Sequence, residues 1–315
     1  MSRLRRLIDG WQRRHASVAF AVAVGRKFVD DRAGAFAALI AYYAFFSIFP
    51  LLLALTSVLG FVLQGDEQLQ EEIVDSVFAE LPVVGPEIRE SVGRIDGSGP
   101  ALAIGLGLAL WAGLGVTLAL SRAFDRVWGV PRVRRRGYVA ARARGLLLLV
   151  AIGVTLVVSS IATGIAIAGE LGSRLESVLA VALSIAVDAI VMALVFLLGT
   201  SRRVRLAEVL PGVLLCTGGL LVLQTLGAVY VQATIQRASA TYGLFAAVIG
   251  LLSWLLVTAQ LLLIATEVNA VRADRLWPRS LGGTLTEADQ RALERATALT
   301  QSDARQRIAV TFDEP

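Results

Sequence analysis

The stretch Ala35–Leu63 reads AFAALIAYYAFFSIFPLLLALTSVLGFVL and runs for 29 residues without a charge. A helix needs roughly 20 apolar residues to cross the hydrocarbon core of a bilayer. A helix buried in a soluble core does not need so long an uncharged run. This stretch therefore predicts a membrane-spanning helix and places the chain among integral membrane proteins.

The composition of the whole chain agrees with a membrane protein. Hydrophobic residues make up 56% of it, charged residues 17%, and the mean hydropathy is +0.69, whereas soluble domains carry about 25% charged residues. The net charge of +5 would raise nucleic acid as a partner for a soluble protein, but the arginines cluster beside apolar runs, so we expect no nucleic-acid partner. A single cysteine and a single histidine, Cys216 and His15, leave little for metal binding or general-base catalysis. We expect no metal, cofactor or catalytic residue.

Six uncharged or nearly uncharged runs predict six spanning helices. They cover about 35–63, 100–121, 145–168, 178–199, 209–231 and 242–266. Lysine and arginine alternate in phase with these runs: 26 lie in the N-terminal segment, the second and fourth connections and the C-terminal tail, and 4 lie in the other connections. Because cytoplasmic loops carry the positive excess, we expect an all-α membrane protein of the cell membrane with both termini in the cytoplasm.

Three segments flank or interrupt these spans. Residues 1–34 form a cytoplasmic segment, predicted as an amphipathic interfacial helix with Leu4, Leu7 and Trp11 toward the acyl boundary. Residues 64–99 carry nine acidic residues and predict an acidic amphipathic outer loop. The spanning domain covers 35–270, and the tail 271–315 is predicted to be partly disordered, with a short helix that begins at a capping box, Thr286–Asp289.

Small and polar residues follow one face of several predicted spans. In the second span they recur every fourth residue, which predicts a surface for close helix packing: Ala101, Gly105, Ala109, Gly113, Thr117 and Ser121. The sixth span places Ser253, Gln260 and Glu267 seven residues apart, and the fifth and third spans offer Thr217 and Gln224, and Thr155, Ser159 and Thr163. These faces either form interhelical hydrogen bonds, worth about 0.6 kcal/mol each, or line a hydrated cavity at the bundle centre.

Asp188 lies near the middle of the fourth span. A carboxylate at that depth costs roughly 2.5–3.5 kcal/mol, so we expect it to face the interior and to have a partner. Gln224 and Gln260 are the expected neighbours, unless the acid is protonated. Asp188 is then either a proton, cation or substrate site, or a buried acid that helps to specify helix packing.

Three motifs stand out along the chain: Ala37–Pro50 in the first span, Arg202-Arg203 followed by Pro211-Gly212, and Tyr242–Trp254 continuing to Glu267-Val-Asn269. Together they resemble the YihY/BrkB family of bacterial inner-membrane proteins. One departure is Ala265-Thr266, where members usually carry Gly-Ala. The resemblance implies a six-helix inner-membrane protein; some members are described as transporters and some as ribonuclease BN. Hydrolytic RNA cleavage needs clustered metal ligands beside an RNA groove, which this sequence does not offer.

Two functions remain open on the sequence alone. The first is transport of a lipid or amphipathic substrate between leaflets or across the membrane, and the second is a non-transporting scaffold or envelope-integrity component. Membrane lipids are the expected partners in both, and the oligomeric state is not indicated. The candidate pathway consists of Tyr42, Tyr43, Ser47, the helix-kinking Pro50, Asp188, Thr217, Gln224, Ser253, Gln260, Glu267 and Asn269.

Overall fold

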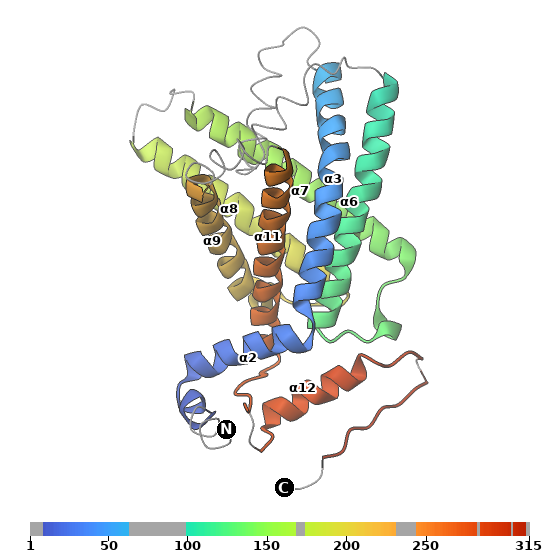
Figure 1. Ribbon diagram of the computed structural model, residues 1–315, viewed down its shortest axis with the longest axis vertical. Coiled ribbons are helices and arrows are strands. Elements are labelled where there is room, and N and C mark those ends of the chain that lie inside the picture. The colour runs from blue at the N-terminus through green and yellow to red at the C-terminus, as the bar shows by residue number, and fades with distance from the viewer. Residues whose placement is uncertain are drawn as a thin grey trace.

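The computed structural model describes residues 9–62, 99–167, 174–230, 244–281, 284–303 and 305–312, and within them all regular structure is helical. Figure 1 shows a bundle of long helices with two shorter ones across one end. The elements are α2 (Ala16–Asp30), α3 (Ala33–Val62), α6 (Gly99–Val127), η1 (Arg132–Arg134), α7 (Tyr138–Ile167), α8 (Arg174–Gly199), α9 (Leu206–Tyr230), α11 (Leu244–Ala273) and α12 (Glu287–Ala298). The predicted outer loop 64–99 lies almost entirely outside the described residues.

The six long helices, α3, α6, α7, α8, α9 and α11, coincide with the six predicted apolar runs. Each has 25 to 30 residues. At a rise of about 1.5 Å per residue, each is longer than a hydrocarbon core of about 30 Å. Within the described residues, three of them contain windows long and apolar enough to cross a membrane: Ala182–Gly199, Leu206–Gly227 and Val248–Ala273. The all-helical class and the membrane character are therefore confirmed.

The helices extend past the apolar runs that predicted them. Helix α6 continues to Val127 through three charged residues, and α11 continues through Glu267 to Ala273, because a charge ends an apolar run without ending a helix. The actual stop of α6 is Gly129, whose φ of +65° suits glycine. The Val130 N–H bonds back to the Asp125 carbonyl at 2.8 Å, which closes the helix by a Schellman-type turn.

The predicted small-residue face of α6 is a packing surface in its described part. A Cβ added at Gly113 would lie 2.9 Å from the Leu149 side chain of α7. Gly115, which lies outside the predicted face, is equally tight, because a Cβ there would lie 2.9 Å from the Tyr43 ring of α3. Ser121 donates a hydrogen bond to the Gly199 carbonyl of α8 at 2.7 Å. Small residues thus let α6 approach three neighbours closely, as membrane helices require.

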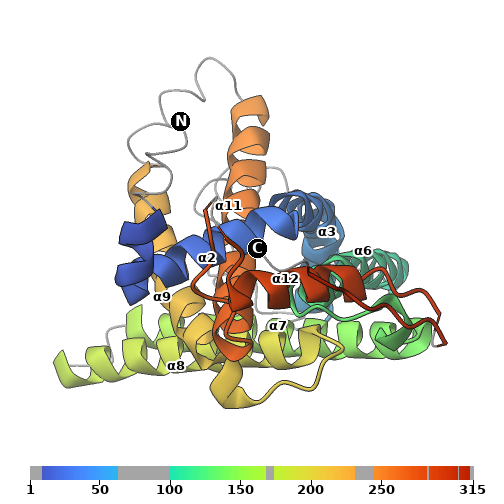
Figure 2. The same ribbon diagram turned by 90° about the horizontal axis from the view of Figure 1, so that it is seen from below.

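The buried core gathers toward one end of the bundle. It includes the start of α3, the ends of α6, α8 and α11 and the start of α9, with Phe124 stacked on Phe196 at 5.7 Å between ring centroids. We call this the basal end; with these helix ends it comprises α2, the connections 128–137 and 200–205, and residues 274–281, 284–303 and 305–312. Figure 2, viewed from below, shows α2 and α12 lying across it.

Helices α9 and α11 meet at the basal end through two motifs of the family resemblance. The Gly212 N–H donates to the Asn269 side-chain oxygen at 2.6 Å. A Cβ at Gly212 would lie 2.5 Å from the Ala265 carbonyl oxygen and would also collide with the Asn269 amide. The helix contact therefore requires glycine at this position.

We predict that Gly212→Ala lowers the thermal stability of the purified protein in detergent, because the added methyl group forces α9 away from α11. Gly218→Ala, six residues further along α9, is the matched control, since nothing lies within 4 Å of its added Cβ. There, alanine removes a helix-interior glycine and should be neutral or stabilising by about 0.5–1 kcal/mol. Equal melting temperatures for both variants would contradict the predicted contact.

Candidate functional site

Lys27, the one lysine in the chain, lies on the buried face of α2 and is 8% exposed. Its ammonium donates to the Val127 carbonyl at the end of α6 at 2.8 Å and to the Asp31 carboxylate one turn further along α2. It also lies 3.0 Å from a carboxylate oxygen of Glu267, which is fully buried in α11. One cation therefore joins α2, α6 and α11.

The contact between Lys27 and Glu267 is an ion pair rather than an aligned hydrogen bond. Neither Glu267 oxygen meets hydrogen-bond geometry with a neighbour, although one of them is 3.0 Å from the ammonium. Burying two charges costs several kcal/mol per ion, and only mutual attraction and further partners offset it. Asp31 is the further partner of the Lys27 ammonium. Asp31 itself also lies 3.4 Å from the Arg126 guanidinium.

A second buried carboxylate, Asp274, follows α11 directly. Arg202 binds both of its oxygens at 3.0 Å, and Arg295 of α12 contacts one of them. Burial by itself would raise the pKa of Asp274, but these two guanidinium groups hold it below its usual value of 3.8. A lowered folded-state pKa means that this stabilisation is present above about pH 4 and is lost as the pH falls further.

A third group of contacts holds the C-terminal segment on α2. Arg279 donates to Asp30 at 2.8 Å and to Asp289 at 3.1 Å. The predicted capping box is present: Thr286 and Asp289 each accept from the other's backbone N–H. Burial favours a raised pKa at Asp289, but N–H groups of Ser280 and Thr286, with the Thr286 and Arg279 side chains, lower it. The tail is thus ordered from 284 to 298 and fixed to α2.

The connection between α6 and α7 is anchored by polar contacts to the end of α8. Asp125 accepts from the Ser201 N–H at 2.6 Å and from the Ser201 hydroxyl at 2.8 Å. Arg136 donates to the Leu198 carbonyl at 2.9 Å and to the Thr200 carbonyl, where the negative end of a helix dipole favours a cation. These contacts fix the connection that carries Arg132 and Arg135.

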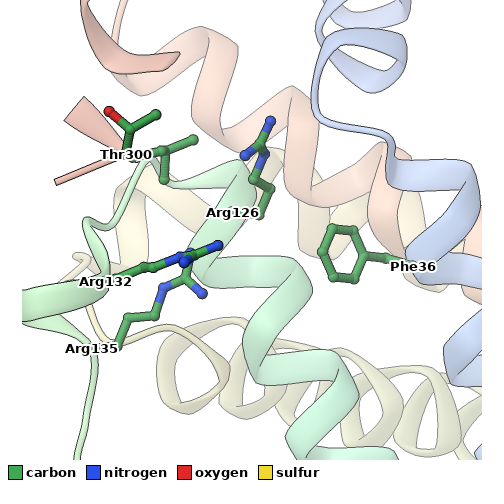
Figure 3. Close-up of a pocket in the computed structure, with 6 residues that line it drawn as sticks. Phe36, Arg126, Arg132, Arg135 and Thr300 are labelled. Atoms are coloured by element: carbon green, nitrogen blue, oxygen red, sulfur yellow. The ribbon is translucent and has the colours of Figure 1, made fainter. Parts of the chain in front are cut away.

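Two cavities open at the basal end. One, of about 340 Å³, is lined by basic and acidic side chains together, among them Lys27, Asp31 and Arg279. The other, of about 300 Å³, is lined by Phe36, Arg126, Arg132, Arg135, Leu299 and Thr300 and is drawn in Figure 3. We call the second the arginine cavity. The two share Arg126 and Leu299.

The predicted pathway residues do not gather at one place. Glu267 and Asn269 lie at the basal end, bound to Lys27 and Gly212. Ser253 lies fourteen residues before Glu267 on α11, which is about 21 Å along the helix at 1.5 Å per residue. Thr217 is buried, Gln260 is partly buried, and Gln224 and Ser253 are exposed. Neither described cavity is lined by any of these six residues.

The aromatic pair of α3 faces two ways. Tyr42 is 54% exposed and packs on Phe46 with 4.8 Å between ring centroids, whereas Tyr43 also covers Gly115 of α6. The Ser47 hydroxyl donates to the Ala44 carbonyl at 2.7 Å within the helix, and Pro50 lies inside α3, which continues to Val62. The described residues therefore show these four in ordinary helix packing.

Asp188 is partly buried near the middle of α8. Within the described residues its carboxylate has neither a hydrogen bond nor an ion pair, so Gln224 or Gln260 as its neighbour, or a protonated acid, stays a prediction. Helical periodicity places residues on a face, but it does not set the rotation of one helix against another.

Sequence reasoning missed Lys27, Asp31, Arg126, Arg132, Arg135 and Asp274. A usable signal existed for Lys27, because a lone lysine in a chain rich in arginine marks a position where an ammonium is needed. Arg132 and Arg135 belong to a run of arginines that the topology already explained, so nothing in the sequence separated them from Arg134.

Apolar helices of spanning length with a charged basal end define an integral membrane protein. The family model described as Virulence factor BrkB matches residues 24–288, so this chain belongs to that family, as its motifs predicted. It is similar to a protein of Bacillus subtilis (strain 168) named "Putative ribonuclease-like protein YfkH", with 22% identity over 246 residues, 74% of this chain and 87% of the relative. No solved structure matches the chain significantly.

We predict that Lys27→Met and Glu267→Gln each lower thermal stability, the first by about 3–5 kcal/mol, because each leaves the other partner buried without its counter-charge. The double variant Lys27→Met/Glu267→Gln should lose less than the two single losses added together. Thermal unfolding of all four proteins in detergent measures this coupling. Additive losses would show that the two charges do not stabilise each other.

Proposed function

We propose that this protein is a six-span membrane transporter of a lipid or amphipathic substrate, with both termini in the cytoplasm. The observation that carries the proposal is Asp188, a carboxylate near the middle of an apolar helix without a counter-ion among the described residues. An ionisable group at membrane depth is costly and is typically found facing a substrate or proton pathway. A transporter can use such a group to bind a polar headgroup or a proton, whereas in a scaffold it would serve helix packing alone.

A polar group on a neighbouring helix supports the same proposal. Ser253 of α11 is exposed within an apolar helix. A side chain of this kind is unfavourable against lipid tails and favourable beside water or a polar headgroup. Exposed apolar surface next to polar groups suits a substrate that has both characters.

A nuclease is a less favourable proposal, although the Bacillus subtilis relative carries "ribonuclease-like" in its name. Metal-dependent hydrolysis uses several carboxylate, histidine or cysteine ligands around one or two ions. In the part of the chain that the structure describes, no group of three or more such residues could hold a metal ion. Five carboxylates at the basal end are instead paired with arginine or lysine: Asp30, Asp31, Glu267, Asp274 and Asp289.

The proposed orientation predicts the labelling of single cysteines in a Cys216→Ser background. Gln70→Cys and Glu90→Cys, in the loop between the first two spans, should react with an impermeant maleimide added outside intact spheroplasts. Arg134→Cys and Gln301→Cys should react only after lysis, because the connections richest in arginine remain in the cytoplasm. External labelling of Arg134→Cys would overturn the orientation.

The transport role predicts that purified protein in liposomes moves a fluorescent phospholipid between leaflets faster than empty vesicles. Asp188→Asn should reduce this rate to near the empty-vesicle level, because it removes the charge but keeps the shape, and Asp188→Glu should restore most of it. Equal insertion of the three proteins is the control. Absence of lipid flux in the wild type would favour the scaffold, and full activity of Asp188→Asn would make the acid structural.

A further inference from the structure

Three arginines from two segments of the chain line the arginine cavity. Arg126 comes from the last turn of α6, Arg132 from η1 and Arg135 from the residue after it. Figure 3 shows them on one side, with Phe36 of α3 on the other and Thr300 at the top. Among the described residues no carboxylate lines this cavity, in contrast to its neighbour, which Asp30 and Asp31 also line.

The positive charges of this cavity are poorly compensated. Arg126 is 3.4 Å from Asp31, and Arg135 donates to the Val130 carbonyl at 3.3 Å. Within the described ranges, Arg132 and Arg135 form no ion pair. Partial burial lowers the pKa of Arg135, and the charges of Arg132, Arg126 and Arg122 lower it further against the opposing effect of Asp125. An anion in the cavity would relieve this repulsion.

Comparison with Arg136 shows that the arginines of the cavity are more than part of a general excess of cytoplasmic arginine. Arg136 is used by the fold, because its guanidinium binds the last carbonyls of α8. Arg132 is exposed and makes no such contact in the described structure, although it lies in the same anchored connection. Arg132 lines the cavity, and its guanidinium is available to a ligand.

The shape and chemistry of the cavity select a class of ligand. A guanidinium group offers a planar fork of donors that matches the oxygens of phosphate and carboxylate, and several of them favour the more highly charged phosphate. A volume of about 300 Å³ is at the small end for ligand pockets, so it holds a headgroup rather than a whole lipid. Phe36 and Leu299 add apolar wall beside the arginines.

We propose that the arginine cavity binds a phosphate monoester, carried either by a lipid headgroup or by a small soluble molecule. This site is separate from Asp188 and would function whether or not the protein transports its ligand. The residues after α12 form part of its wall, so the docked C-terminal segment is needed to complete it.

Binding can be measured by titration calorimetry on the full-length protein in a neutral detergent. Glycerol 3-phosphate tests the soluble source and dioctanoyl phosphatidic acid the lipid source; dioctanoylglycerol, which lacks phosphate, is the control ligand. Tight binding of glycerol 3-phosphate identifies a soluble phosphate, and binding of phosphatidic acid alone identifies a lipid. Failure of both, or equal binding of dioctanoylglycerol, overturns the proposal.

Comparing Arg132→Gln with its matched control Arg134→Gln shows whether phosphate binds in the arginine cavity. Both arginines are exposed in the same short turn, but only Arg132 lines the cavity. Loss of a charged hydrogen bond should weaken phosphate binding by about tenfold or more in Arg132→Gln, while Arg134→Gln stays close to wild type. Equal weakening in both would show a general electrostatic effect of the basic surface and would overturn the site. The melting temperature without ligand checks that each variant is folded.

Discussion

The ion pair between Lys27 and Glu267 is the interaction on which the basal end of this protein depends. Helix α2 packs on the end of α11 through a small apolar cluster around Ala23 and Val271, and charged contacts fix its position further. Lys27 connects α2 to α11 through Glu267 and to the last turn of α6 through a backbone carbonyl, and Asp31 at the end of α2 also binds its ammonium. Removing either charge leaves the other buried, which makes the arrangement of α2, α6 and α11 close to all-or-none.

The remaining charged contacts extend outward from this pair. Asp31 connects Lys27 to Arg126, and Asp30, the preceding residue, binds Arg279 of the C-terminal segment. Asp274 connects Arg202 to Arg295 of α12. Through these carboxylates the two ends of the chain and the connection between α8 and α9 lie together at one end of the bundle. The arginine cavity exists because residues 299–300 and the α6–α7 connection are held against each other there.

The sequence was sufficient to predict the helices, because long uncharged runs and small-residue spacing are local properties. It also placed Gly113 on a face of small residues for close helix packing and Gly212 in one of the motifs of the family resemblance. It could not predict that α11 continues to Ala273, or that Glu267 pairs with Lys27, 240 positions earlier, instead of lining a cavity with Gln260 and Ser253. Those outcomes depend on the rotation and crossing of helices, which periodicity along one helix does not contain. For the same reason the arginine run did not distinguish Arg132 from Arg134.

The use of lysine at position 27, in a chain whose other 29 basic residues are arginine, follows from the geometry of its partners. A carbonyl and two carboxylates surround the ammonium from three directions, and an ammonium has three donors that can be shared among them. A guanidinium is planar and larger, and its donors suit one bidentate partner rather than three separate ones. Arg202, which binds both oxygens of Asp274, shows the opposite case in the same network. Lysine and arginine are therefore not interchangeable here. Lys27 connects three helices through separate contacts of one ammonium, whereas Arg202 binds a single carboxylate with two parallel hydrogen bonds.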